Sequence, residues 1–173
     1  MKSLIKLSGI VLIGLYCFNA ANAQTVKVDK KAAKSAEIAK LINSRNYIFR
    51  ADRATPLRGG NKQLTSEYDV TISKDKIVIY LPYYGRAYSA PMDATDGGIK
   101  LTSTHFDYKA EQGKKGDWSI TIKPKEKNLS GSKDVQLLRL SSSADGYASL
   151  QVTCLNRDAI SFSGYIEEAP KEK

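Results

Sequence analysis

Residues 117–123 read Asp-Trp-Ser-Ile-Thr-Ile-Lys, and every second side chain in them is apolar. The apolar residues Trp118, Ile120 and Ile122 alternate with the polar residues Ser119, Thr121 and Lys123. This pattern is typical of a strand that buries one face. The same period of two begins after residue 46 and continues along the chain. We therefore expect a mainly β protein from residue 46 onward.

Outward from this segment, runs of alternating residues are separated by turn signals such as residues 73–75 and 156–158. Eight or nine short strands of this kind favour an antiparallel β-sandwich or a small closed β-barrel, and the sequence leaves that choice and the strand order open. Adjacent Leu137 and Leu138 also leave one face assignment open. The expected strands are 47–51, 68–72, 77–81, 98–103, 106–111, 117–123, 134–141, 147–155 and 159–166.

One helix is expected before the β domain. Residues 29–45 contain no Gly or Pro, and Ile38, Leu41 and Ile42 recur at helical spacing. Asp29 is suited to the N-cap position. We expect this helix to pack over an edge or the mouth of the β domain.

The first 23 residues have the features of a secretory signal. Lys2 and Lys6 precede an apolar run, residues 7–18, and small residues follow at 19–23. The run is about 12 residues long, whereas a helix that spans a bilayer needs roughly 20. We expect a signal peptide at 1–23, a helical segment at 24–45, a β domain at 46–168, a disordered tail at 169–173, and no transmembrane span in the mature chain.

The composition limits the possible chemistry. The chain is 42% hydrophobic and 26% charged, which is ordinary for a globular domain, and its net charge is +9. It has one His, and Cys154 is the only cysteine beyond the leader. An imidazole-rich metal centre and an intramolecular disulfide are therefore not expected, and we predict no metal and no cofactor.

Two long motifs resemble a known family. The segments 64–69 (Leu-Thr-Ser-Glu-Tyr-Asp) and 81–91 (Leu-Pro-Tyr-Tyr-Gly-Arg-Ala-Tyr-Ser-Ala-Pro) are similar to those of exported bacterial proteins called domain of unknown function 4251. Tyr84 stands where many members have Phe. The resemblance implies an exported envelope protein of a Gram-negative bacterium, and it brings no catalytic residue. The resemblance to the family continues through residues 96–99, 115–118, 146–150 and 156–164.

The same region supplies the candidate binding surface. Tyrosine rings offer flat apolar faces with a polar tip, and an arginine can bind a carboxylate or phosphate through two parallel hydrogen bonds. Alternatively, these side chains only pack at the end of a strand, with their hydroxyls satisfied internally. The candidate binding residues are Tyr83, Tyr84, Arg86, Tyr88, Asp93 and Asp96.

Other motifs are weaker. The Asp93 to Gly97 loop departs from the spacing of a calcium loop and has too few carboxylates. Cys154 lies on an apolar strand face, which argues against a nucleophile paired with His105. Lys27, Lys30, Lys31 and Lys34 form a basic stripe that is either simply solvated or faces lipid phosphates or acidic glycans. No nucleic-acid-binding motif is present, so nucleic acid is not an expected partner.

These observations favour a non-catalytic module that binds a glycan, a lipid or another envelope protein in the periplasm or cell envelope. Two alternatives remain: a hydrolase that acts on an envelope polymer through carboxylates, and a structural protein of surface assembly. If the sheets close on Trp118, Ile120, Val152 and Phe162, the functional surface must lie on the outer loops.

Overall fold

The computed structural model describes residues 30–88, 97–126 and 131–170. These residues form one helix at 30–44, nine strands and a short 3-10 helix. The elements after the helix are β1 (Tyr47–Pro56), β2 (Lys62–Ile72), β3 (Ile77–Leu81), β4 (Ile99–Ser103), β5 (Phe106–Gln112), β6 (Trp118–Pro124), η1 (Gly131–Lys133), β7 (Val135–Ser142), β8 (Tyr147–Cys154) and β9 (Ile160–Glu168).

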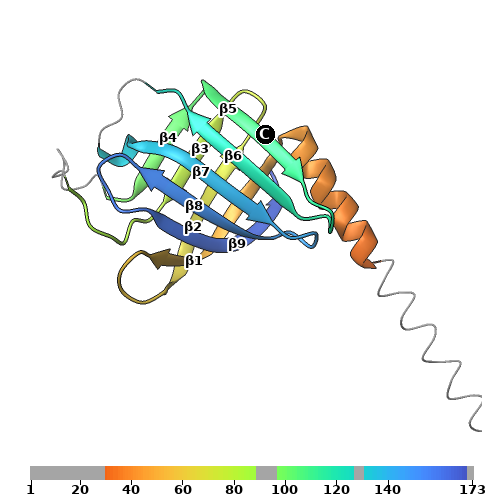
Figure 1. Cartoon of the computed structure of the whole chain (residues 1–173), viewed down its shortest axis with the longest axis horizontal. Helices are drawn as coiled ribbons and strands as arrows, with labels where there is room; N and C mark the ends of the chain where they lie inside the picture. The colour runs from red at the N-terminus through yellow and green to blue at the C-terminus, as the bar shows by residue number, and fades with distance from the viewer. Residues whose placement is uncertain (1–29, 89–96, 127–130, 171–173) are drawn as a thin grey trace, which may run out of the picture.

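All nine strands belong to one antiparallel sheet, in the order β4-β3-β2-β1-β9-β8-β7-β6-β5. Nearly every neighbour in this order is also a neighbour in the chain, and the exception is β1 beside β9. The sheet curls into a nearly closed barrel, whose two halves cross each other in Figure 1. Of the two architectures that the sequence left open, the barrel is the one formed.

The two edge strands of the sheet are continuous in the chain. β4 pairs with β3, β5 pairs with β6, and only Thr104 and His105 separate them. β4 and β5 therefore act as two halves of one strand that changes partner at a corner. The backbone carbonyl of His105 accepts a hydrogen bond from the Lys125 N–H at 2.8 Å, which ties this corner to the end of β6. The chain itself thus closes the gap between the sheet edges.

The inward side chains form one core. Trp118, Ile120, Val152 and Phe162 are at most 6% exposed and belong to a single cluster of buried residues. Burial of this apolar surface is the main term that stabilises the fold. Since the barrel closes on these four residues, the functional surface is expected on the outside of the barrel.

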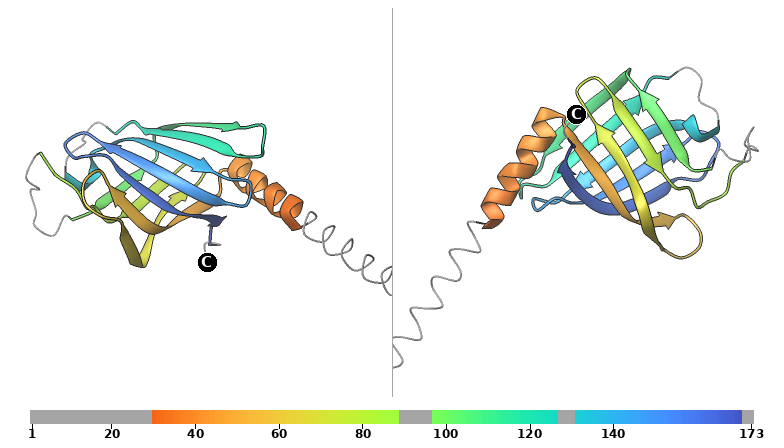
Figure 2. Two further views of the ribbon diagram at one scale, coloured as in Figure 1. Left: turned by 60° about the horizontal axis from the view of Figure 1, so that its bottom comes forward. Right: turned by 180° about the vertical axis from the view of Figure 1, so that it is seen from behind.

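The N-terminal helix covers one end of the barrel (Figure 2). Ile38 and Ile42 are fully buried and join the barrel core, as the helical spacing predicts. The Tyr108 hydroxyl lies 3.1 Å from that of Tyr47 and donates to the Ile42 carbonyl at 3.4 Å. Arg45 ends the helix with a φ of 52° and places its guanidinium 4.6 Å from the centre of the Tyr108 ring. These contacts fix the helix over the mouth of the barrel. Asp29, the expected N-cap, and residues 1–23, the expected signal peptide, lie outside the described residues.

No helix in the described ranges is both long and apolar enough to cross a membrane.

Each expected strand is present. β1 and β2 extend beyond the expected 47–51 and 68–72, because their pairing resumes on the far side of a bulge: Ala51 pairs with Tyr68, and the next pair is Arg53 with Gln63. Bulges of this kind accentuate twist and change the direction of side chains. Gly164 of β9 lies beside the same irregularity, where a Cβ would stand only 1.9 Å from the Arg50 carbonyl oxygen.

Candidate functional site

Three of the connections at the end of the barrel opposite the helix contact one another: β3 to β4, β6 to β7, and β8 to β9. Backbone pairing joins the first of these to the third. Ala87 and Arg157 form an antiparallel bridge, and the Tyr88 N–H donates to the Asn156 carbonyl at 2.8 Å. The Asp158 N–H donates to the Arg86 carbonyl at 3.0 Å. We call this region the loop end.

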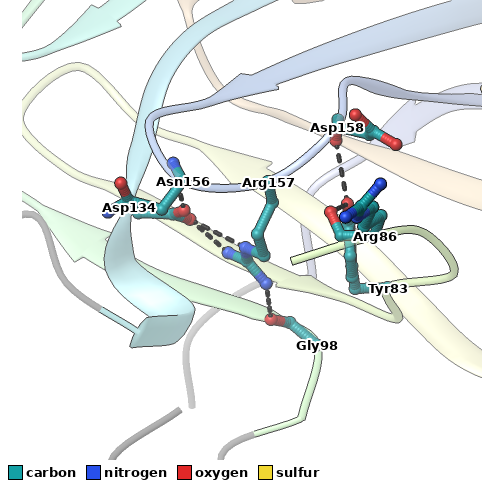
Figure 3. A network of polar contacts seen from close by, with 7 residues as sticks. All are labelled: Tyr83, Arg86, Gly98, Asp134, Asn156, Arg157 and Asp158. Atoms are coloured by element: carbon teal, nitrogen blue, oxygen red, sulfur yellow. Dashed lines mark hydrogen bonds and ion pairs between the residues drawn. The ribbon is translucent and has the colours of Figure 1, made fainter. Parts of the chain in front are cut away.

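A buried ion pair anchors the loop end (Figure 3). The Arg157 Nε donates to the Asp134 Oδ1 at 3.0 Å, and its Nη2 contacts the same oxygen. The two side chains are only 9% and 1% exposed. Arg157 Nη1 also donates to the Gly98 carbonyl at 2.6 Å, while the Asn156 N–H donates to the Asp134 Oδ2 at 3.2 Å. One guanidinium therefore holds all three connections together. We call these four residues the clamp.

Tyr83 is packed onto the clamp. Its ring centre lies 4.7 Å from the guanidinium carbon of Arg157. Its hydroxyl donates a hydrogen bond shared between the carbonyls of Arg86 and Asp158, at 2.9 and 3.1 Å. Burial, with the charge of Asp158 next, raises the pKa of Tyr83 to about 12. The hydroxyl is thus used within the fold, where it positions the loop.

Three neighbours of Tyr83 point to solvent. Tyr84 is 38% exposed, Tyr88 is 63% exposed, and Arg86 is exposed as well. The guanidinium carbon of Arg86 lies 5.7 Å from the centre of the Tyr88 ring, and the Tyr88 hydroxyl bonds to the Asp158 carboxylate. That hydrogen bond raises the pKa of Tyr88. Two rings and one cation are therefore displayed on a braced segment. Of the sequence candidates, Asp93 and Asp96 lie outside the described residues.

Cys154 lies beside the clamp and is buried. Burial, followed by the charge of Asp134, raises the pKa of the thiol to about 12, so almost no thiolate forms at neutral pH. His105 lies at the corner between β4 and β5, where its Nδ1 is 3.1 Å from the Thr104 hydroxyl. This environment does not support a cysteine nucleophile.

A second feature, on the outer surface, was not anticipated from the sequence. A groove of about 950 Å³ lies over the outer face of β3 and β4 and extends to the segments on either side of residues 127–130. We call it the β3–β4 groove. Its lining side chains are Val78, Tyr80, Lys100, Thr102, His105, Lys125, Glu126 and Lys133.

The aromatic wall of this groove is Tyr80. It is 48% exposed and stacks on Tyr68, with ring centres 5.5 Å apart and planes 27° apart. Lys100 is the direct cross-strand partner of Tyr80, and its Nζ lies 5.9 Å from the ring centre. The available sequence signal was a tyrosine at the outward position between buried Ile79 and Leu81. What the sequence could not show is which strands flank it.

The basic stripe of the helix is solvent-exposed where it is described. Lys30, Lys31 and Lys34 are all exposed, and Lys34 forms an ion pair with Glu37 at 3.2 Å. Lys27 lies outside the described residues. In the part of the chain that the structure covers, no three His, Cys, Asp or Glu side chains gather in an arrangement that could hold a metal ion.

The fold and these surfaces define a class: a helix-capped antiparallel β-barrel with a packed interior and outward-facing candidate sites. The chain belongs to the family described as domain of unknown function (DUF4251), whose model matches residues 29–166. The resemblance identified from the sequence motifs is thereby confirmed.

A solved structure shares this fold. The crystal structure of a DUF4251 family protein from Bacteroides eggerthii DSM 20697 superposes with a TM-score of 0.57 at 14% sequence identity. The match covers 80% of this chain and 91% of that one. A search of the curated proteins found no match. The comparison therefore supports the architecture alone.

Proposed function

We propose that this protein is a non-catalytic interaction module of the bacterial cell envelope, and that its loop end binds another envelope protein. The secretory signal predicted for the first 23 residues motivates the location. The observation that carries the proposal is the display of Tyr84, Arg86 and Tyr88 on a segment fixed by the clamp.

The residue types suit a protein partner. Tyrosine and arginine are enriched in the contact centres of protein interfaces, because each supplies a large contact area together with hydrogen-bonding groups. A loop already held in place loses little conformational freedom on binding, which increases affinity. The backbone bonds of Tyr88 and Asp158 provide that preorganisation.

The alternative of carboxylate catalysis has less support. Two-carboxylate hydrolysis needs two acids that face one reacting bond. Asp134 is committed to Arg157, and the residues that line the β3–β4 groove include a single carboxylate, Glu126. A glycan or a lipid at the loop end, and a purely structural role, remain as outcomes of the experiment below.

Site-specific photocrosslinking in intact cells tests the proposal. A benzophenone side chain at position 84 should form a crosslink of defined mass with a second protein. The crosslink should disappear when Arg86→Ala and Tyr88→Ala are added. The same probe at Tyr165, an exposed tyrosine of β9 that is 48% accessible, is the matched control. Equal crosslinking from both positions, or crosslinks only to glycan, lipid or another copy of this chain, would contradict the proposal.

A further inference from the structure

The β3–β4 groove has the size of a ligand site and lies on the outer face of the sheet. Its volume of about 950 Å³ falls in the range of protein clefts that hold small molecules, which is roughly 300–1,000 Å³. The floor consists of two directly opposed cross-strand pairs, Tyr80 with Lys100 and Val78 with Thr102. Because β3 and β4 are hydrogen-bonded to each other, this floor is rigid.

One wall is a preorganised aromatic face. Tyr68 stacks on Tyr80 and is itself packed against the core, so the Tyr80 ring is held in one place. About half of Tyr80 remains exposed. A half-exposed ring that is held in place offers an apolar surface against which a flat, partly apolar ligand such as a sugar ring can pack.

The remaining walls are positively charged. Lys100, Lys125 and Lys133 line the groove, against one carboxylate, that of Glu126. The Lys125 Nζ forms an ion pair with Asp107 at 2.6 Å. Lys100 and Lys133 form no ion pair with any described residue. The Lys100 ammonium lies 5.9 Å from the centre of the Tyr80 ring, and neither of the two charges is neutralised by a described carboxylate, so both can attract a ligand with negative charge.

We propose that the β3–β4 groove binds an acidic saccharide, whose ring stacks on Tyr80 and whose anionic group is held by Lys100 and Lys133. The aromatic face selects the sugar ring, and the lysines select the charge. The groove shares the β6–β7 connection with the loop end, through Lys125, Glu126 and Lys133, but it is lined by none of Tyr84, Arg86 and Tyr88. The proposal therefore stands whether or not those three side chains bind a protein.

Calorimetric titration of the purified protein tests the site with three probes: a hexamer of galacturonic acid, a neutral hexamer of glucose, and glucose 6-phosphate. The uronic acid hexamer should bind more tightly than the neutral hexamer, and its affinity should fall as salt is added, because exposed charges are screened. If only glucose 6-phosphate binds, the acidic saccharide is a sugar phosphate and the β3–β4 groove is still its binding site. If neither acidic probe binds, or if the neutral hexamer binds as tightly as the acidic one, the proposal is overturned.

Substitutions locate the binding. Tyr80→Ala should weaken binding of the acidic probe by about tenfold, whereas Tyr80→Phe should preserve it, because the ring face remains. Lys100→Ala with Lys133→Ala should abolish the salt dependence. Tyr165→Ala removes a tyrosine with the same 48% exposure from β9 and should leave the affinity unchanged. Equal affinity in Tyr80→Ala and the wild type, with both folded by circular dichroism, would overturn the proposal.

Discussion

Arg157 and Asp134 form a nearly buried ion pair, although 23 residues separate them in the chain. Asp134 immediately precedes β7, and Arg157 lies between β8 and β9. Because the guanidinium also reaches the Gly98 carbonyl before β4, one pair fixes three connections. The loop end of the barrel is therefore ordered by a single set of polar contacts.

Removal of one member of the clamp should be strongly destabilising. Arg157→Met leaves the Asp134 carboxylate buried without its partner, and the free energy of unfolding should fall by about 3–5 kcal/mol. Adding Asp134→Leu should restore much of that loss, since no charge is then buried. Urea unfolding measures both. The control is Arg50→Ala, which removes exposed pairs with Glu67 and Glu167 and should cost at most about 1 kcal/mol. Equal losses in Arg157→Met and Arg50→Ala would contradict the role of the clamp.

Alkaline pH should destabilise the protein through its buried tyrosines. The pKa of Tyr83 is about 12 in the fold, against 10 in an exposed tyrosine, and burial also raises the pKa of Tyr47. Between these values the folded state binds more protons than the unfolded one, so stability falls as pH rises. The contribution of Tyr83 to the free energy of unfolding is complete below pH 10 and is lost as the pH approaches 12.

Tyr83→Phe should lower the stability at neutral pH by about 1 kcal/mol, because a hydrogen bond is lost. It should also flatten the alkaline decline seen in the wild type. Thermal unfolding from pH 8 to 11 gives both quantities. An unchanged alkaline slope in Tyr83→Phe would show that its hydroxyl titrates like an exposed phenol.

Gly164 should not accept a side chain. A Cβ at this position would lie 1.9 Å from the Arg50 carbonyl oxygen, and that backbone is held in β1. Gly164→Ala should therefore cost about 1–3 kcal/mol or prevent folding. Gly60→Ala is the control, since nothing lies within 4 Å of a Cβ there. Similar urea midpoints for the two variants would mean that β1 and β9 are farther apart than described.

Cys154 should be inert in the native protein. Its thiol is buried with a pKa of about 12, so iodoacetamide at pH 8 should leave it unmodified until urea unfolds the chain. Peptide mass spectrometry follows the modification of this residue. Rapid native labelling of Cys154 would indicate an accessible thiolate and would reopen the case for nucleophilic chemistry.

Much of the fold was predictable from the sequence, because the alternation of apolar and polar residues along a strand shows which side chains are buried. The apolar members of residues 117–123 are buried, as are Ala148, Leu150, Val152 and Cys154, the face assigned to β8. Leu137 and Leu138 were ambiguous because adjacent leucines break the period. A bulge at Val135/Leu137 shifts the register between β7 and β8, so the alternation changes phase there. Leu138 is the residue that points inward.

The closure of the barrel and the clamp were not predictable from local pattern. Alternation within β4 and β5 says which side chains are buried, but it does not say that the chain changes partner at Thr104 and His105. An aspartate before a strand and an arginine in a turn are both ordinary surface residues by sequence. Only the pairing of β7, β8 and β9 brings Asp134 to Arg157. Tyr80 and Lys100 likewise meet through the register of β3 and β4.

The clamp orders the segment that displays Tyr84, Arg86 and Tyr88. Amide hydrogen exchange tests this ordering most directly. The Tyr88 and Asp158 amides, bonded to the carbonyls of Asn156 and Arg86, should be protected in the wild type.

In Arg157→Met, these two amides should exchange much faster, under conditions where the protein remains folded. The Gly113 amide, which bonds to the Asp117 carbonyl between β5 and β6, should keep its wild-type rate. If the Tyr88 and Asp158 amides already exchange without protection in the wild type, or keep full protection in Arg157→Met, the clamp does not order this surface.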